Sequence, residues 1–188
     1  PAVYDMLAIM KGKLDAGRAL LYQTARYVDI YKALDDIARE RKLTPEERQE
    51  QKKYAKLADS FTPLAKGMNS EYANQNAYDC IQIHGGSGFM LEYACQRIYR
   101  DARITSIYEG TTQLQTVAAI RYVTNGSYIA TIREFEAIPC SPEMEPLMSR
   151  LKKMADKFEA STNAVKEAQD QELLDFTARR LMEMAADI

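Results

Sequence analysis

A carboxylate just before a helix start is the best candidate in this sequence for acid–base chemistry. Glu109 precedes Gly110 and stands two residues before Thr111, where a helical pattern begins. Free backbone N–H groups at a helix start favour anions, including pyrophosphate. The neighbours Ile107 and Tyr108 would partly desolvate the carboxylate and raise its pKa from about 4.3, which would make it a stronger base. An ordinary surface charge favoured by the helix dipole explains the same spacing, so both interpretations stay open.

A cluster of glycines at residues 85–88 is the second departure from helical patterning. Glycine allows another backbone or a ligand to approach closely. A plain helix stop and tight turn is the simpler interpretation from composition alone. The run is not a dinucleotide-binding fingerprint, because that motif follows a strand and a helix precedes this one.

The side chains that most often bind metals are few and scattered. His84 is the only histidine and stands at a helix end, where capping or packing is a simpler role than membership of a catalytic triad. Cys80, Cys95 and Cys140 lack C-x-x-C spacing. We therefore expect no metal site, and we expect reduced thiols in a cytoplasm-like compartment.

Composition excludes several classes of protein. The 188 residues suit one large domain or two small ones, and 46% of them are hydrophobic, which is enough for a core. A net charge of −2 does not supply the basic field that nucleic-acid binding needs. The sequence has no apolar run long enough to span a membrane and no signal peptide.

Helical periodicity dominates the first half of the chain. Apolar residues recur at helical spacing over residues 3–39. Thr44, followed by Pro45 and with Glu47 three residues later, predicts a capping box and a second helix. Thr62 and Pro63 predict a further helix start, and the glycines end that helix near residue 84.

The second half continues the same pattern. We expect helices at residues 93–101 and 111–124, a stop at Asn125 and Gly126, and two last helices that separate near Asp170. Strand signals are nearly absent. The sequence predicts an all-α fold, an antiparallel four-helix bundle over residues 1–138, with the start of an additional helical segment at residues 139–188.

Four blocks of sequence occur in order within residues 82–115: Gln82-Ile83-His84-Gly85-Gly86-Ser87-Gly88-Phe89, Glu92-Tyr93, Tyr99-Arg100-Asp101-Ala102-Arg103 and Ile107-Tyr108-Glu109-Gly110-Thr111-Thr112-Gln113-Leu114-Gln115. In these blocks the sequence resembles the C-terminal helical domain of the acyl-CoA dehydrogenase family. Weaker similarity covers residues 2–123.

The resemblance implies an FAD-dependent oxidoreductase of fatty-acid metabolism that removes two hydrogens from the Cα–Cβ bond of an acyl-CoA. Glu109 matches the catalytic base that takes the α-proton, while the β-hydrogen leaves as hydride to the flavin. The backbone N–H of Glu109 matches a donor to the thioester carbonyl. Tyr108 and Gly110 match the wall of the acyl-CoA pocket.

The resemblance also implies how FAD is held. Thr111 and Gln113 match positions that contact the phosphate and adenosine portions of FAD. Gln82 and Gly86 match positions that contact the FAD of a neighbouring subunit, so a homodimer or homotetramer is implied. Thr116 stands where the family often has Arg, which puts a local ion pair in doubt.

The same resemblance suggests a larger context. The family's N-terminal and β-domains have no counterpart here, so we expect a piece of a longer polypeptide that is inactive alone. Electron-transferring flavoprotein is the expected electron acceptor, in the cytoplasm or, in a eukaryote, the mitochondrial matrix. The segment after Pro142 resembles larger members, some of which act on short or sulfur-containing acyl-CoAs. The alternatives are an acyl-CoA oxidase and a non-catalytic scaffolding or nucleic-acid-protecting module.

Overall fold

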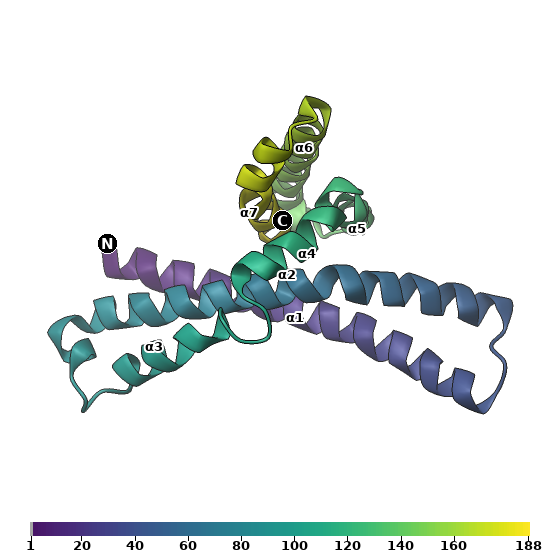
Figure 1. The fold of residues 1–188 in the computed structure, drawn as a ribbon. Helices are drawn as coiled ribbons and strands as arrows, with labels where there is room; N and C mark the ends of the chain where they lie inside the picture. Colours follow the sequence, from purple (N-terminus) through teal and green to yellow (C-terminus); the bar gives the residue numbers. More distant parts are fainter. Residues whose placement is uncertain (1) are drawn as a thin grey trace. The chain divides into compact units, whose positions relative to one another are not determined.

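A computed structural model describes residues 2–188, and every regular element within this range is a helix (Figure 1). The predicted all-α fold class is therefore confirmed. None of the helices in the described range is both long enough and apolar enough to cross a bilayer. The chain forms two compact units, one ending at Gln115 and the other spanning Thr116–Ile188, and each is described by itself. The predicted domain division at 138/139 stays a prediction.

Two long antiparallel helices form the centre of the first unit, α1 (Ala2–Glu40) and α2 (Pro45–His84) (Figure 1). The first predicted helix is thus confirmed within one residue at each end. Tyr27 of α1 meets Phe61 of α2 edge to face, with ring centroids 5.3 Å apart, and both rings are buried. Such aromatic pairs add to the stability that burial provides.

The capping box at the start of α2 is confirmed. The Thr44 hydroxyl accepts the Glu47 N–H at 3.2 Å, and the Glu47 carboxylate accepts the Thr44 N–H at 2.8 Å. The predicted helix start at Thr62 and Pro63 is wrong, because α2 continues through both residues. Thr62 does not cap a new helix, since its hydroxyl donates back to the Ala58 carbonyl of the same helix at 2.7 Å. Pro63 is buried, and packing stabilises the continuous helix there.

Shorter elements complete the first unit. A 3-10 turn, η1 (Gly85–Phe89), follows α2, and α3 (Ala94–Thr105) packs beside α2 as an antiparallel neighbour (Figure 1). α3 extends four residues beyond the predicted end. The helix α4 (Thr112–Thr124) follows a short loop; its first four residues belong to the first unit and the rest to the second.

The second unit contains α5 (Ser127–Glu136), the 3-10 turn η2 (Pro142–Met144), α6 (Glu145–Ala168) and α7 (Gln171–Asp187). The predicted break near Asp170 is confirmed, because its carboxylate accepts the N–H groups of Glu172 and Leu173 as the N-cap of α7. Arg133 of α5 donates to Asp156 and Glu159 of α6 at 2.7 and 2.6 Å. This ion-pair network joins the two helices.

Candidate functional site: the glutamate loop and the glycine turn

Residues 106–111, here called the glutamate loop, connect α3 to α4. The N–H groups of Ile107 and Tyr108 both donate to the Ile104 carbonyl, at 2.9 and 3.1 Å, which extends the last turn of α3. The Thr112 N–H then donates to the Ser106 carbonyl at 3.2 Å and closes the loop. The loop is therefore a compact turn with defined ends.

Two consecutive residues of this loop have left-handed backbone conformations. Glu109 has φ 52° and Gly110 has φ 95°. Glycine adopts such angles freely, but a residue with a side chain does so at a cost of about 1–3 kcal/mol. Glu109 is exposed, and its carboxylate has no hydrogen-bond or ion-pair partner within residues 2–188. The fold thus holds a free carboxylate at a strained position.

Side chains from α2 and α4 hold the loop in this conformation. The ammonium group of Lys66 donates to the Gly110 carbonyl at 2.5 Å and lies 5.7 Å from the centre of the Tyr108 ring. The amide of Gln115 donates to the Glu109 carbonyl at 3.2 Å. Lys66 was not predicted from the sequence, because it stands 44 residues before Gly110 and no local spacing connects the two.

The start of α4 follows the glutamate loop directly. The Thr111 hydroxyl accepts the Leu114 N–H at 3.3 Å and so caps α4, whose first residue is Thr112. The Thr112 hydroxyl donates to the Glu71 carboxylate of α2 at 2.6 Å, which ties the helix start to α2. Thr111 and Gln113 are both exposed. One loop and helix start therefore bring together five predicted site residues: Tyr108, Glu109, Gly110, Thr111 and Gln113.

The remaining predicted site residues lie at the glycine turn, the name used here for η1. Gly85 has φ 60° and ends α2, as the sequence predicted. Gln82 and Gly86 are exposed, and an added Cβ at Gly86 would meet no atom within 4 Å. The 12 residues of α3 span about 18 Å. The structure thus separates Gln82 and Gly86 from the glutamate loop by the length of α3.

The glycine turn packs closely against the end of α2. Gly88 is buried, and an added Cβ there would lie 2.7 Å from the Ile81 carbonyl oxygen. The buried thiol of Cys95 donates to the Gly88 carbonyl at 3.4 Å. This turn depends on the close approach of two backbone segments.

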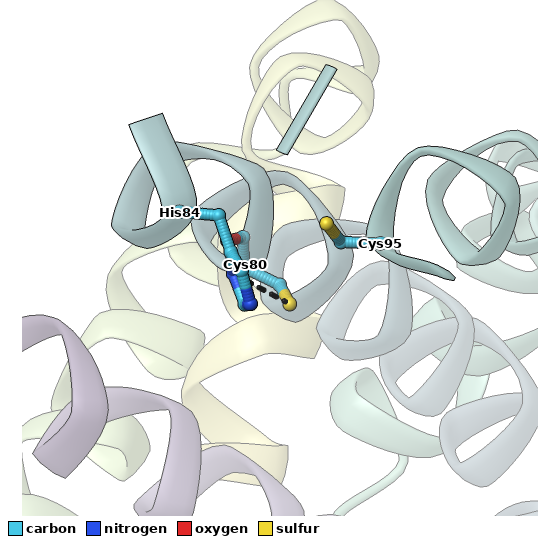
Figure 2. A group of neighbouring side chains, drawn as sticks. All are labelled: Cys80, His84 and Cys95. Carbon is cyan, nitrogen blue, oxygen red and sulfur yellow. Dashed lines mark hydrogen bonds between the residues drawn. The ribbon is translucent and has the colours of Figure 1, made fainter. Parts of the chain in front are cut away.

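A group of side chains beside this turn was missed by the sequence analysis. Cys80 and His84 of α2 and Cys95 of α3 place three possible ligand atoms within 4.8 Å of one another (Figure 2). The His84 Nδ1 atom lies 2.8 Å from the Cys80 carbonyl oxygen, so His84 does cap the last turn of α2. Burial, with the Cys95 thiol nearby, raises the pKa of the Cys80 thiol. The available signal was the four-residue spacing of Cys80 and His84, which places both on one face of a helix.

Two family models match the chain. "Acyl-CoA dehydrogenase, C-terminal domain" matches residues 1–123, and "Acyl-CoA dehydrogenase C terminal" matches residues 124–188.

Individual relatives give the same result. The chain is 37% identical over 115 residues to 3-methylmercaptopropionyl-CoA dehydrogenase of Ruegeria pomeroyi, and the aligned region covers 61% of this chain and 18% of the relative. It is 31% identical over 198 aligned positions to butyryl-CoA dehydrogenase of Syntrophomonas wolfei, and the aligned region covers 99% of this chain and 30% of the relative. The chain therefore spans less than a third of the length of these relatives.

A solved structure supports the fold. The crystal structure of an acyl-CoA dehydrogenase complexed with FAD from Bacillus anthracis superposes with a TM-score of 0.64 at 22% identity. The match covers 96% of this chain and 32% of that chain. The family models, the relatives and this fold agree, and the chain belongs to the acyl-CoA dehydrogenase family.

Proposed function

We propose that this chain is the C-terminal part of an FAD-dependent acyl-CoA dehydrogenase in which Glu109 removes the α-proton of an acyl-CoA thioester. The observation that carries the proposal is the presentation of Glu109. An exposed carboxylate without a partner among residues 2–188 stands at a left-handed position that Lys66 and Gln115 support. A base held in a fixed position removes a proton faster than a mobile one.

The backbone of the glutamate loop suits the substrate's carbonyl. Within the described part of the chain, the N–H groups of Glu109 and Gly110 have no acceptor. A fixed donor stabilises the negative charge that develops on a thioester oxygen as the α-proton leaves. We assign this role to the N–H of Glu109, with Tyr108 and Gly110 beside the acyl-CoA.

The residues at the start of α4 fit FAD chemically. The Thr111 hydroxyl accepts one hydrogen bond and retains its own O–H for a phosphate oxygen. The exposed Gln113 amide offers both a donor and an acceptor. The positive end of the helix dipole favours a phosphate there. When bound, FAD would accept the β-hydrogen of the substrate together with two electrons.

The glycine turn suits contact with a second subunit. Phe89 and Leu91 are 80% and 85% exposed beside the open surface of Gly86. Large apolar side chains exposed together are typical of protein interfaces. We propose a homo-oligomer in which Gln82 and Gly86 contact FAD held by the neighbouring subunit, since α3 separates them from their own glutamate loop.

The substrate and partners of the whole protein follow from the family. One of the two relatives is named for a sulfur-containing acyl-CoA and the other for a short acyl-CoA. We propose a short or sulfur-containing acyl-CoA as the substrate. We also propose electron-transferring flavoprotein as the electron acceptor. We place the enzyme in the cytoplasm, or the mitochondrial matrix in a eukaryote. Residues 1–188 alone are expected to turn over no acyl-CoA, because the family's other domains supply much of the flavin and acyl-chain pocket.

Anaerobic bleaching of the flavin by acyl-CoAs tests the proposal. The intact protein should bleach, and Glu109→Gln should slow bleaching at least about 100-fold, because the amide is not a base. Glu50→Gln, which changes an exposed carboxylate on α2, should bleach like the wild type. A protein that binds FAD but is bleached by no acyl-CoA would contradict the proposal and favour a non-catalytic module. Rapid reoxidation of the bleached flavin by oxygen would instead indicate an oxidase.

A further inference from the structure

We propose that Cys80, His84 and Cys95 form a binding site for Zn²⁺ at the junction of α2, the glycine turn and α3. The proposal does not depend on the proposed enzymatic function, because none of these side chains has a role in it. It rests on the type, the distances and the structural origin of three ligand atoms.

The distances are close to those of a tetrahedral zinc site. The three possible ligand atoms, one from each side chain, lie within 4.8 Å of one another. Zinc–sulfur bonds of about 2.3 Å in a tetrahedron place two sulfur atoms roughly 3.8 Å apart. The site therefore has to contract by at most about 1 Å. His84 is exposed and Cys80 half-buried, so both side chains have room to rotate.

Two rigid elements supply the ligands from opposite sides. Cys80 and His84 stand four residues apart in the last turns of α2, and Cys95 is the second residue of α3 (Figure 2). Ligands four residues apart on a helix share one face and can bind a single ion. Zinc would connect the end of α2 to the start of α3 and hold the glycine turn between them.

The surroundings of the ligands are compatible with metal binding. A neutral imidazole carries one N–H and one lone pair. The short distance from His84 Nδ1 to the Cys80 carbonyl places the N–H on Nδ1, which leaves the lone pair on Nε2. Histidines that bind zinc commonly donate their other N–H to a carbonyl in this way. Cys95 gives up its weak thiol bond to the Gly88 carbonyl when it binds.

The ligand types select zinc among the common divalent ions. Two thiolates and an imidazole are a soft to borderline set, which suits Zn²⁺. The set contains no oxygen ligand, and Mg²⁺ and Ca²⁺ require several. Three protein ligands leave the fourth tetrahedral position for a water molecule. Each thiol loses its proton to solvent when its sulfur binds the ion.

Titration of the intact, reduced protein with Co²⁺ tests the site. Tetrahedral cobalt bound by thiolates absorbs in the red, where a flavin does not, and Zn²⁺ should abolish this absorption by displacement. One Co²⁺ per chain is expected at this site. Cys80→Ser and His84→Ala should each weaken cobalt binding at least about 100-fold. Cys140→Ser, which changes an exposed cysteine far along the chain, should leave binding unchanged.

His84→Ala is the decisive variant because the side chain is exposed and its backbone contact is to the Cys80 carbonyl at the end of α2. Circular dichroism of this variant checks that the helical fold is kept. The absence of red absorption in the wild type would overturn the proposal. Red absorption that stays unchanged in both His84→Ala and Cys80→Ser would also overturn the proposal. Loss of the absorption in Cys140→Ser would overturn it as well. A disulfide between Cys80 and Cys95 that yields no cobalt site after reduction would also overturn it and assign the pair to thiol oxidation.

Discussion

The glutamate loop and the glycine turn both interrupt the helices of the first unit, but the chain fixes them in different ways. Side chains hold the glutamate loop: Lys66 and Gln115 donate to its carbonyls, and the Thr112 hydroxyl donates to Glu71. Backbone contact holds the glycine turn, where Gly88 lies directly against the Ile81 carbonyl. Long side chains from other helical positions support the glutamate loop. The glycine turn instead depends on Gly88 having no side chain.

This difference bears on what each connection can do. Long side chains from α2 and α4 allow the glutamate loop to present an exposed carboxylate while its backbone stays fixed. A turn pressed against α2 cannot change locally without moving the helix end, but it leaves Gly86 open to a ligand. Substitutions at the glycine turn should therefore cost the most stability, and substitutions at the glutamate loop should cost less stability but change the chemistry.

Gly88→Ala should have the largest effect on stability. Its Cβ would meet the Ile81 carbonyl at 2.7 Å and the His84 Cβ at 3.0 Å, and the backbone must shift to relieve this contact. We expect a loss of about 2–3 kcal/mol of unfolding free energy, measured by urea denaturation. Gly86→Ala is the matched control, with a change within about 0.5 kcal/mol because its Cβ meets open space. Equal losses for the two variants would contradict the backbone-contact explanation.

Lys66→Met should have the next largest effect and should act on both stability and chemistry. It removes the charged donor to the Gly110 carbonyl while keeping most of the side chain's apolar contacts. We expect a loss of about 1.5 kcal/mol of unfolding free energy. In the intact enzyme kcat should fall about 10-fold with little change in KM, because Glu109 loses its fixed position.

Lys66→Arg provides the corresponding control, since a guanidinium can also donate to the carbonyl. It should restore most of kcat. If kcat is unchanged in Lys66→Met while stability falls, Lys66 supports the fold and does not position the base.

Gly110→Ala should have a smaller effect on stability than Lys66→Met. At φ 95° an alanine is strained, but the atom its Cβ would meet at 2.7 Å is the flexible end of Gln115. That side chain can move away, so we expect a loss of about 1 kcal/mol, measured by urea denaturation. A loss as large as that of Gly88→Ala would mean that the glutamate loop is as rigid as the glycine turn.

The same comparison explains which features the sequence predicted. Local signals worked: Thr44, Gly85, Thr111 and Asp170 mark helix ends through contacts within three residues. Pro63 misled because it is buried inside α2, where packing outweighs the local preference of proline for a helix start. Lys66 and the group around Cys95 depend on contacts between distant segments, which no local pattern encodes. The sequence thus located the carboxylate but not the side chains that support it.

The connection between α1 and α2 offers a third way of fixing a turn, by charge, and it has the smallest expected effect. Arg41 binds the Glu47 carboxylate through two hydrogen bonds of 2.8 and 2.6 Å, and the Thr44 N–H donates to the same carboxylate. These donors lower the pKa of Glu47 from 4.5 to about 2. Since the folded pKa lies below the unfolded value, the stabilisation is complete above pH 4.5 and is lost as the pH falls toward 2.

Glu47→Gln should therefore be slightly less stable than the wild type near neutral pH, because the amide keeps the Thr44 contact but loses the ion pair. The difference in unfolding free energy should shrink as the pH falls from 4.5 toward 2, and urea denaturation across that range measures it. Glu46→Gln removes a neighbouring carboxylate that has no side-chain partner in the described range, so its difference should be smaller at neutral pH. A Glu47→Gln difference that stays constant with pH would mean that the capping geometry, not the charge, fixes this turn, as backbone contact does at Gly88.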